Sequence, residues 1–179
     1  MPEINMPHWK CIHTIVFDFD GVFTDNKVWV DQDGKESVRC DRGDGLAFDM
    51  LRQFKEKNNW ELTYFILSKE VNHVVQSRAS KLKIPCIRGA LNKDEYLRMY
   101  LKKKKQKTEG LLYVGNDLND LFAMRLAGIS VAPSDAHPII KEQATIVLEK
   151  KGGQGFIRTL IEMLLRINQM TDDDLATLI

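Results

Sequence analysis

The chain has 179 residues, of which 44% are hydrophobic and 28% are charged, and its formal net charge is +1. This length suits one well-buried core, so we expect a single domain over residues 1–179 with its core at about 11–168. The near-neutral charge excludes a global attraction to nucleic acid or anionic lipid, and no run approaches the roughly 18 apolar residues of a membrane span. We therefore predict neither a nucleic-acid nor a membrane partner.

The cysteines and the start of the chain bear on the cellular compartment. Cys11, Cys40 and Cys86 are odd in number, widely spaced and without a CxxC pair, which favours neither a disulfide framework nor a zinc site. The first ten residues lack the apolar core of a signal peptide. Together these features predict a cytoplasmic protein.

Short apolar runs alternate with helical patterns along the chain. Unbroken runs of this kind suit strands that are buried on both faces, and they lie at 12–17, 62–67, 84–87, 111–115, 128–132 and 145–149. Apolar residues at helical spacing lie between or after them, at 46–54, 71–82, 96–101 and 156–165. This alternation predicts βαβ units and an α/β fold with a doubly wound, mostly parallel sheet.

One segment after the first strand departs from this alternation. Residues 27–39 read KVWVDQDGKESVR and alternate with the period of a strand on each side of Asp33-Gly34, a strong hairpin signal. We therefore predict a protruding β-hairpin directly after the first strand. We interpret residues 1–10 and 170–179 as tails.

Polar side chains follow four of the predicted strands. Sheets of this class place their sites at the carboxyl ends of their strands, so these side chains should gather at one edge. In chain order they belong to Asp18, Asp20, Thr24, Asp25, Ser68, Lys69, Glu70, Lys93, Asn116, Asp117 and Asp120.

The first pair, Asp18 and Asp20, would repel one another unless a cation lay between them. A turn with a helix cap is the alternative interpretation, but it accounts for one aspartate and not for the whole set. The second acidic cluster, at Asp117 and Asp120, favours an oxygen-lined site for a hard divalent ion. Since Mg²⁺ typically takes one or two carboxylates together with waters and phosphate oxygens, the sequence predicts a magnesium and phosphate site.

The order of these motifs resembles the haloacid dehalogenase superfamily: DFDGVFTD at 18–25, a serine after an apolar strand, a lysine, and GNDLND at 115–120. The resemblance covers about residues 12–165 and is greatest to the 3-deoxy-D-manno-octulosonate 8-phosphate phosphatase subfamily. Features similar to that subfamily are FTDNKVW with its hairpin, RGDGLAF, SRASKLKI and EKKGGQG. The resemblance implies a phosphatase with a Rossmann-like fold. It also implies no cap domain, because the chain has no room for one.

The resemblance also implies a role for each motif residue. Asp18 would attack phosphorus and form an aspartyl-phosphate, while Asp20 would protonate the departing sugar oxygen and then activate water. Ser68 would donate to a phosphoryl oxygen, and Lys93 would offset charge on the transferring group. The Mg²⁺ ligands would be Asp18, the Asp20 carbonyl, and Asn116 or Asp117.

Two positions depart from the usual pattern of the family. Asn116 stands where a metal-binding Asp is usual; its amide oxygen can still ligate Mg²⁺, with one negative charge less. Lys69 stands where this subfamily often has Gly. The sequence leaves open whether Asn116 or Asp117 contacts the ion.

The implied substrate is a 2-keto-3-deoxy sugar acid phosphate, first of all 3-deoxy-D-manno-octulosonate 8-phosphate. The alternative is the 9-phosphate of a nine-carbon ulosonate such as sialic acid or KDN. Residues expected to contact the substrate are Thr24, Asp44, Lys69, Glu70 and Arg78. We also expect a homo-oligomer, a tetramer, because a capless site needs a neighbouring subunit to exclude water.

Two other classes of protein compete with the enzyme. A phosphoacceptor receiver domain also combines an Asp, a hydroxyl and a Lys at a sheet edge, but it does not require Asp20. A non-catalytic assembly module of a sugar-activating enzyme would have no need to retain Asp18, Asp20, Ser68 and Lys93, and only Asn116 favours it. The complete set of motif residues therefore favours an enzyme.

Overall fold

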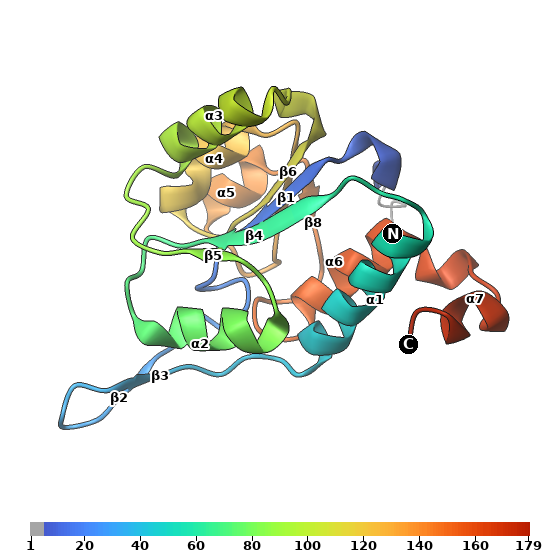
Figure 1. Ribbon diagram of the computed structural model, residues 1–179. Helices are drawn as coiled ribbons and strands as arrows, with labels where there is room; N and C mark the ends of the chain where they lie inside the picture. Colours follow the sequence, from blue (N-terminus) through green and yellow to red (C-terminus); the bar gives the residue numbers. More distant parts are fainter. Residues whose placement is uncertain (1–5) are drawn as a thin grey trace.

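A computed structural model describes residues 6–179 and contains a central six-stranded sheet with helices on both faces (Figure 1). The strand order is β5-β4-β1-β6-β7-β8, and every neighbouring pair is parallel. The predicted α/β fold with a doubly wound, mostly parallel sheet is therefore confirmed. The strands are β1 (Thr14–Phe17), β4 (Thr63–Leu67), β5 (Cys86–Ile87), β6 (Leu111–Val114), β7 (Ile129–Ala132) and β8 (Ile146–Val147).

The alternating side chains of the strands divide the core into two halves. On β1, Ile15 and Phe17 join one apolar cluster and Val16 joins the other. Helices α1 (Gly43–Lys57), α2 (His73–Leu82) and α6 (Phe156–Leu165) cover the first face, and α3 (Lys93–Lys104), α4 (Leu121–Leu126) and α5 (Pro138–Gln143) cover the second. Since both faces are covered, the strands are apolar throughout, which is the pattern that predicted them. None of the helices within residues 6–179 has the length and apolarity needed to cross a membrane.

The predicted hairpin is present and projects from the body of the molecule below α2 (Figure 1). Its strands, β2 (Trp29–Val30) and β3 (Glu36–Ser37), pair antiparallel, and the connecting turn uses Gly34 at φ +76°. One side-chain contact ties the hairpin to the body, because Asn72 Nδ2 donates to Glu36 Oε2 at 2.6 Å. Apart from this hairpin no regular element lies between β1 and α1, so nothing is inserted there that could act as a cap.

The expectation that both ends of the chain are tails was wrong for the described residues. Trp9, in the short 3₁₀ helix η1 (Trp9–Cys11), packs its ring 5.3 Å from that of Trp60. At the other end, η4 (Ile167–Gln169) and α7 (Asp172–Ala176) continue the chain, and Leu178 is only 2% exposed in the core under α1 and α6. Residues 1–5 lie outside the described part. The acidic run at 172–174 masked the apolar residues of this segment, of which Leu178 joins the core and Met170 packs against it.

This anchoring yields a stability prediction. Leu178→Ala should lower the free energy of unfolding by about 2 kcal/mol, because it removes a buried side chain from a site that can partly collapse. Ile179→Ala is the matched control, since Ile179 is 78% exposed and should leave stability unchanged. Urea unfolding followed by circular dichroism would measure both. Equal midpoints for the two variants would contradict the packing of Leu178.

Candidate active site

The candidate site lies at the carboxyl edge of the three central strands. In the parallel register Phe17 pairs with Ile66 on β4 and with Val114 on β6, so the residues that follow these strands meet at one edge. Asp18 follows β1 directly, and its backbone N–H donates to the Val114 carbonyl at 2.8 Å. Lys93 is the first residue of α3, which delivers its side chain to the same place.

Lys93 forms the centre of the charge arrangement. Its Nζ lies 2.7 Å from Asp18 Oδ1 and 2.7 Å from Asp120 Oδ1. All three side chains are at least 95% buried, with side-chain exposures of 2% for Lys93, 5% for Asp18 and 0% for Asp120. Asp18 Oδ1 also accepts the backbone N–H of Phe19 at 2.7 Å. The two carboxylates thus share one ammonium inside the protein.

Asp120 is itself fixed by several hydrogen bonds. Its Oδ2 accepts the backbone N–H groups of Asn116 at 2.9 Å and Asp117 at 3.3 Å, and its Oδ1 accepts the Tyr113 hydroxyl at 2.7 Å. Burial raises the pKa of Tyr113 well above its usual range, so the phenol remains protonated and donates. Gly115 makes room for Asp120, since a Cβ at position 115 would lie 2.6 Å from its carboxyl carbon. Sequence reasoning placed Asp120 in the acidic cluster but assigned it no role.

The charges of this cluster do not balance. One ammonium cannot neutralise two buried carboxylates, and burial raises the pKa of Asp18 to about 8, with a further contribution from Asp120 and an opposing one from Lys93. Burial alone lowers the pKa of Lys93, but Asp18 and Asp120 outweigh this effect and raise it. The ammonium is therefore stable, and one negative charge is left over for a proton or a cation to balance.

Asp20 is more exposed than Asp18 and lies where the hairpin meets the site. Burial raises its pKa, as do the nearby carboxylates Glu70 and Glu36, while Lys93 opposes the shift. Glu36 belongs to the hairpin strand β3, so the hairpin contributes a charge to the mouth of the site. The structure thus brings Asp20 near Lys93 and Glu70, which the sequence placed at the same edge, and adds Glu36, which no motif indicated.

The segment after β4 turns tightly at the same edge. Ser68 is 1% exposed, and its hydroxyl oxygen accepts the Glu70 backbone N–H at 3.0 Å. Glu70 Oε1 accepts the N–H groups of Val71 and Asn72 at 2.8 and 3.1 Å, at the approach to α2. Lys69 is exposed. Ser68 therefore points its hydroxyl into a turn at the site, whereas Lys69 and Glu70 lie on the rim.

Asn116 supplies an oxygen that lacks a partner. Its Oδ1 is buried and accepts no hydrogen bond from any residue in 6–179. The side chain packs on Gly21, where a Cβ would lie 1.9 Å from Asn116 Nδ2 and where φ is +73°, so this contact requires glycine. Asp117 is exposed instead, and its Oδ1 accepts the Leu118 N–H at 2.7 Å as a cap of η3 (Leu118–Asp120). Of the two candidates, Asn116 offers the free buried oxygen.

Thr24 supports the loop that follows Asp20. The residue is fully buried, and its hydroxyl oxygen accepts the N–H groups of Gly21 at 3.1 Å and Asn26 at 3.2 Å. It also forms an isolated antiparallel bridge with Cys40. This hydroxyl is therefore committed to the backbone of its own loop, and a substrate contact by Thr24 stays a prediction.

Asp44 on α1 and Arg78 on α2 face one another. Asp44, in the first turn of α1, is 1% exposed, and its Oδ2 lies 3.9 Å from Arg78 Nη2 on α2. Arg78 Nη2 also donates to the Asp41 carbonyl at 2.5 Å. Neither carboxylate oxygen of Asp44 accepts a hydrogen bond within the described residues. Asp44 is thus placed to orient Arg78, and substrate contacts by Asp44 and Arg78 both stay predictions.

A sequence profile described as haloacid dehalogenase-like hydrolase matches residues 41–160, more than half of the chain. The chain belongs to the haloacid dehalogenase-like hydrolase family. Its similarity to solved structures extends further: a HAD family hydrolase from Streptomyces avermitilis is 41% identical with a TM-score of 0.82, and the match covers 90% of this chain and 95% of that one. The family resemblance seen in the motifs is thereby confirmed.

Similar proteins of this family include phosphatases. The 3-deoxy-D-manno-octulosonate 8-phosphate phosphatase KdsC of Escherichia coli is 28% identical over 163 residues, which are 90% of this chain and 84% of the relative. The structure of that phosphatase from Moraxella catarrhalis, in complex with magnesium ion, phosphate ion and KDO, is 26% identical with a TM-score of 0.82 and matches over 94% of each chain. The family and these relatives confirm the prediction of a phosphatase.

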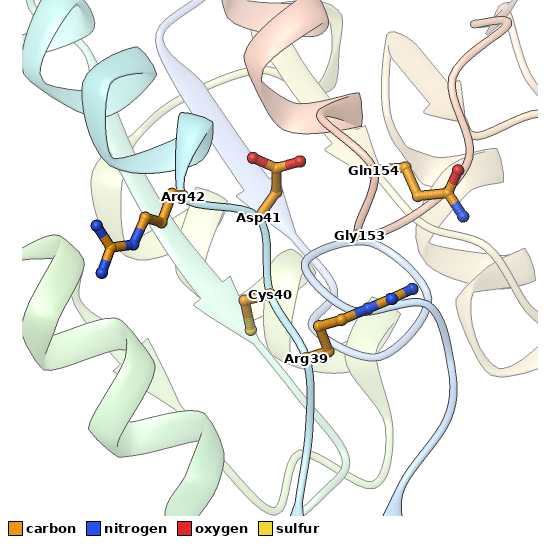
Figure 2. A pocket seen from close by; sticks show the side chains of 6 residues that line it. All are labelled: Arg39, Cys40, Asp41, Arg42, Gly153 and Gln154. Carbon is orange, nitrogen blue, oxygen red and sulfur yellow. The ribbon is translucent and has the colours of Figure 1, made fainter.

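A separate open pocket of about 570 Å³ lies beside this haloacid dehalogenase-type site. Figure 2 shows Arg39 to Arg42 on the segment that leads into α1, facing Gly153 and Gln154 on the loop that leads into α6. Arg39 is paired with Asp25 at 2.8 Å. Gly152, next in the same loop, packs on the Gly21 carbonyl, where a Cβ would lie at 1.9 Å. The GGQG turn is thus held against the motif loop of its own subunit.

The Asp44 environment predicts a pH effect on stability. Burial raises the pKa of Asp44 from 3.8 to about 7, against the attraction of Arg78 and with a further contribution from Asp41. The folded state therefore holds this proton more tightly, and the stabilisation is complete below the unfolded pKa and is lost as the pH rises through 7. Asp44→Asn should flatten the decline in unfolding free energy between about pH 4 and pH 7, measured by urea unfolding.

The control for this experiment is Asp49→Asn on the same helix. The Asp49 side chain is 61% exposed, so its variant should keep the pH dependence of the wild type. If Asp44→Asn and Asp49→Asn gave parallel stability profiles, the raised pKa of Asp44 would be wrong.

Proposed function

We propose that this protein is a magnesium-dependent phosphomonoesterase that uses Asp18 as its nucleophile. The observation that carries the proposal is the ion pair of 2.7 Å between Lys93 Nζ and Asp18 Oδ1 at the end of β1. A buried carboxylate on a rigid strand end, held beside an ammonium, is suited to attack a phosphoryl group whose charge the same ammonium can offset.

The proposed reaction has two displacements. Asp18 attacks phosphorus, and the P–O bond to the sugar breaks as Asp20 gives its proton to the departing oxygen. Asp20 then takes a proton from water, which attacks the aspartyl-phosphate and releases inorganic phosphate with Asp18 restored. Throughout, Lys93 offsets charge on the transferring group, and the Ser68 hydroxyl donates to a phosphoryl oxygen.

The residues at this edge fit a magnesium ion. Within residues 6–179 no three His, Cys, Asp or Glu side chains are grouped for metal binding, so a carbonyl or amide oxygen must complete the ligands. Asn116 Oδ1 is such an oxygen, buried and without a hydrogen-bond donor among the described residues. Asp18, the Asp20 carbonyl and Asn116 would hold the ion, which would neutralise the excess negative charge and polarise phosphate oxygens.

The substrate we propose is a 2-keto-3-deoxy sugar acid phosphate, with 3-deoxy-D-manno-octulosonate 8-phosphate first. The names of the relatives and the KDO bound in the Moraxella catarrhalis structure support this choice. At the site, Lys69 and Glu70 supply exposed charged groups at the rim, and Arg78 would supply a guanidinium from α2. A nine-carbon ulosonate 9-phosphate is the alternative, since the mouth is open toward solvent.

We further propose that a homo-oligomer closes this site. The three consecutive hairpin residues Val28, Trp29 and Val30 are 51%, 61% and 60% exposed, which is a large apolar surface for an isolated two-stranded ribbon. A second copy covering the hairpin would exclude water near Asp20, which no inserted cap does within residues 6–179. Light scattering at assay concentration checks the proposal, and a fully active monomer would refute it.

The proposed chemistry can be tested by replacing the nucleophile, Asp18. The wild type should release phosphate from an aryl phosphate, lose activity with EDTA and regain it with Mg²⁺. Asp18→Asn should reduce turnover to background while the protein stays folded, because the side chain keeps its size and loses its nucleophilic oxygen. Asp25→Asn, the same exchange at a carboxylate paired with Arg39, should stay active. Comparable activities of Asp18→Asn and wild type would overturn the mechanism.

The substrate is tested by relative kcat/KM. The eight-carbon 8-phosphate should be preferred over nine-carbon 9-phosphates and, by a wider margin, over hexose phosphates, because only the ulosonates present a carboxylate to Arg78. Arg78→Gln should narrow the margin over hexose phosphates and leave aryl phosphate hydrolysis largely unchanged. A preference for hexose phosphates in the wild type would contradict the proposed substrate and leave the phosphatase chemistry standing.

A further inference from the structure

We propose that Tyr113 is a positioning residue of this site, whose hydroxyl fixes Asp120 so that Asp120 in turn holds Lys93 against Asp18. The inference rests on the proposed function, because it concerns the ammonium that serves phosphoryl transfer there. Tyr113 lies on β6 and touches neither Asp18 nor Lys93 by a hydrogen bond in the described structure. Its effect must therefore pass through Asp120.

The contacts form a continuous buried chain. The Tyr113 hydroxyl donates to Asp120 Oδ1 at 2.7 Å, Lys93 Nζ donates to the same oxygen at 2.7 Å, and Lys93 Nζ reaches Asp18 Oδ1 at 2.7 Å. Tyr113 and Asp120 are both fully buried. With water excluded, each of these charge-assisted hydrogen bonds is strong, and a lost donor cannot be replaced by solvent.

The count of donors shows why the phenol matters. Asp120 accepts two backbone N–H groups at Oδ2 and the two donors Tyr113 and Lys93 at Oδ1. An ammonium has three N–H donors, of which Asp18 and Asp120 use two, so one is left for a phosphoryl oxygen. Without the phenol, Oδ1 would depend on Lys93 alone. Lys93 would then be drawn toward Asp120 and away from Asp18 and the reacting phosphoryl group.

A second tyrosine in the same half of the core provides the contrast. Tyr100 on α3 packs against the apolar cluster on this face of the sheet, with its ring 5.2 Å from that of Phe65. Its buried hydroxyl has no hydrogen-bond partner within residues 6–179. A buried tyrosine hydroxyl in this half of the core can therefore lack a hydrogen-bond partner within the described residues. The hydroxyl of Tyr113, by contrast, donates to Asp120, the fully buried carboxylate that also accepts from Lys93.

The test compares Tyr113→Phe with Tyr100→Phe in the full chain. Both remove one hydroxyl from the same half of the core. With aryl phosphate and saturating Mg²⁺, Tyr113→Phe should lower kcat about tenfold with KM changed less than about twofold, which matches the loss of one hydrogen bond to a charged group. Tyr100→Phe should keep both parameters. Equal kcat values for the two variants, or a change confined to KM, would overturn the proposal.

Two further measurements separate positioning from folding. In the background of Asp120→Asn, Tyr113→Phe should have almost no additional effect on kcat, because both act on one contact. Reductive methylation of Lys93, followed by mass spectrometry without substrate, should be several-fold slower in Tyr113→Phe than in Tyr100→Phe, because Lys93 is then held more closely by the buried Asp120. Additive effects, unchanged methylation, or loss of the cooperative melting transition in Tyr113→Phe would each refute the positioning role.

The outcomes also distinguish this inference from the proposed function. If the wild type released no phosphate, or if Asp18→Asn were fully active, the proposed function would fail, whereas the methylation rates would still judge the Tyr113 contact. If Asp18→Asn were inactive and Tyr113→Phe behaved like Tyr100→Phe, the proposed function would stand and only the role of Tyr113 would be rejected.

Discussion

A single ammonium shared between two buried carboxylates constrains everything around it. Burying Lys93 with Asp18 and Asp120 is tolerable only while the geometry is kept, since removing one partner of a buried pair typically costs about 3–5 kcal/mol. The fold meets this demand with rigid elements: Asp18 follows a central strand, Lys93 opens α3, and Asp120 is fixed by two backbone N–H groups. The site is thus attached to the least deformable part of the molecule.

The two-sided sheet explains how these groups reach one point. Strand alternation places Tyr113 on the face covered by α3, α4 and α5, and α3 brings Lys93 from that same face. The opposite face, covered by α1, α2 and α6, holds the Asp44 and Arg78 pair close to the motif loop. In the proposed function, the charge of the transferring group and the rest of the substrate would therefore be contacted from different layers, the first by Lys93 and the second by Arg78.

The sequence predicted the strands well because burial on both faces leaves unbroken apolar runs. It also predicted that Asp18, Ser68 and Lys93 lie at the same edge of the sheet, because parallel strands end at one edge. It did not assign roles to Asp120 and Tyr113, since their contacts depend on register and on the docking of α3. Short helices such as α4 and α5 left no clear periodicity in six residues. Leu178 was missed because the acidic run at 172–174 dominates the composition of the segment 170–179.

Electrostatics links the hairpin to the chemistry. Asp20, Glu36 and Glu70 add negative charge at the mouth of a site that already holds one carboxylate more than its ammonium can balance. A phosphomonoester that also carries a carboxylate would be repelled by such a surface unless positive charge were added. Arg78 adds one positive charge, but it already faces the buried Asp44, so further balance would come from a bound cation at the motif residues, from a subunit that covers the hairpin, or from both. The exposed hairpin and the unpartnered oxygen of Asn116 therefore bear on the same question. That question is how an acidic sheet edge without an inserted cap would accept a ligand that carries both a phosphate and a carboxylate.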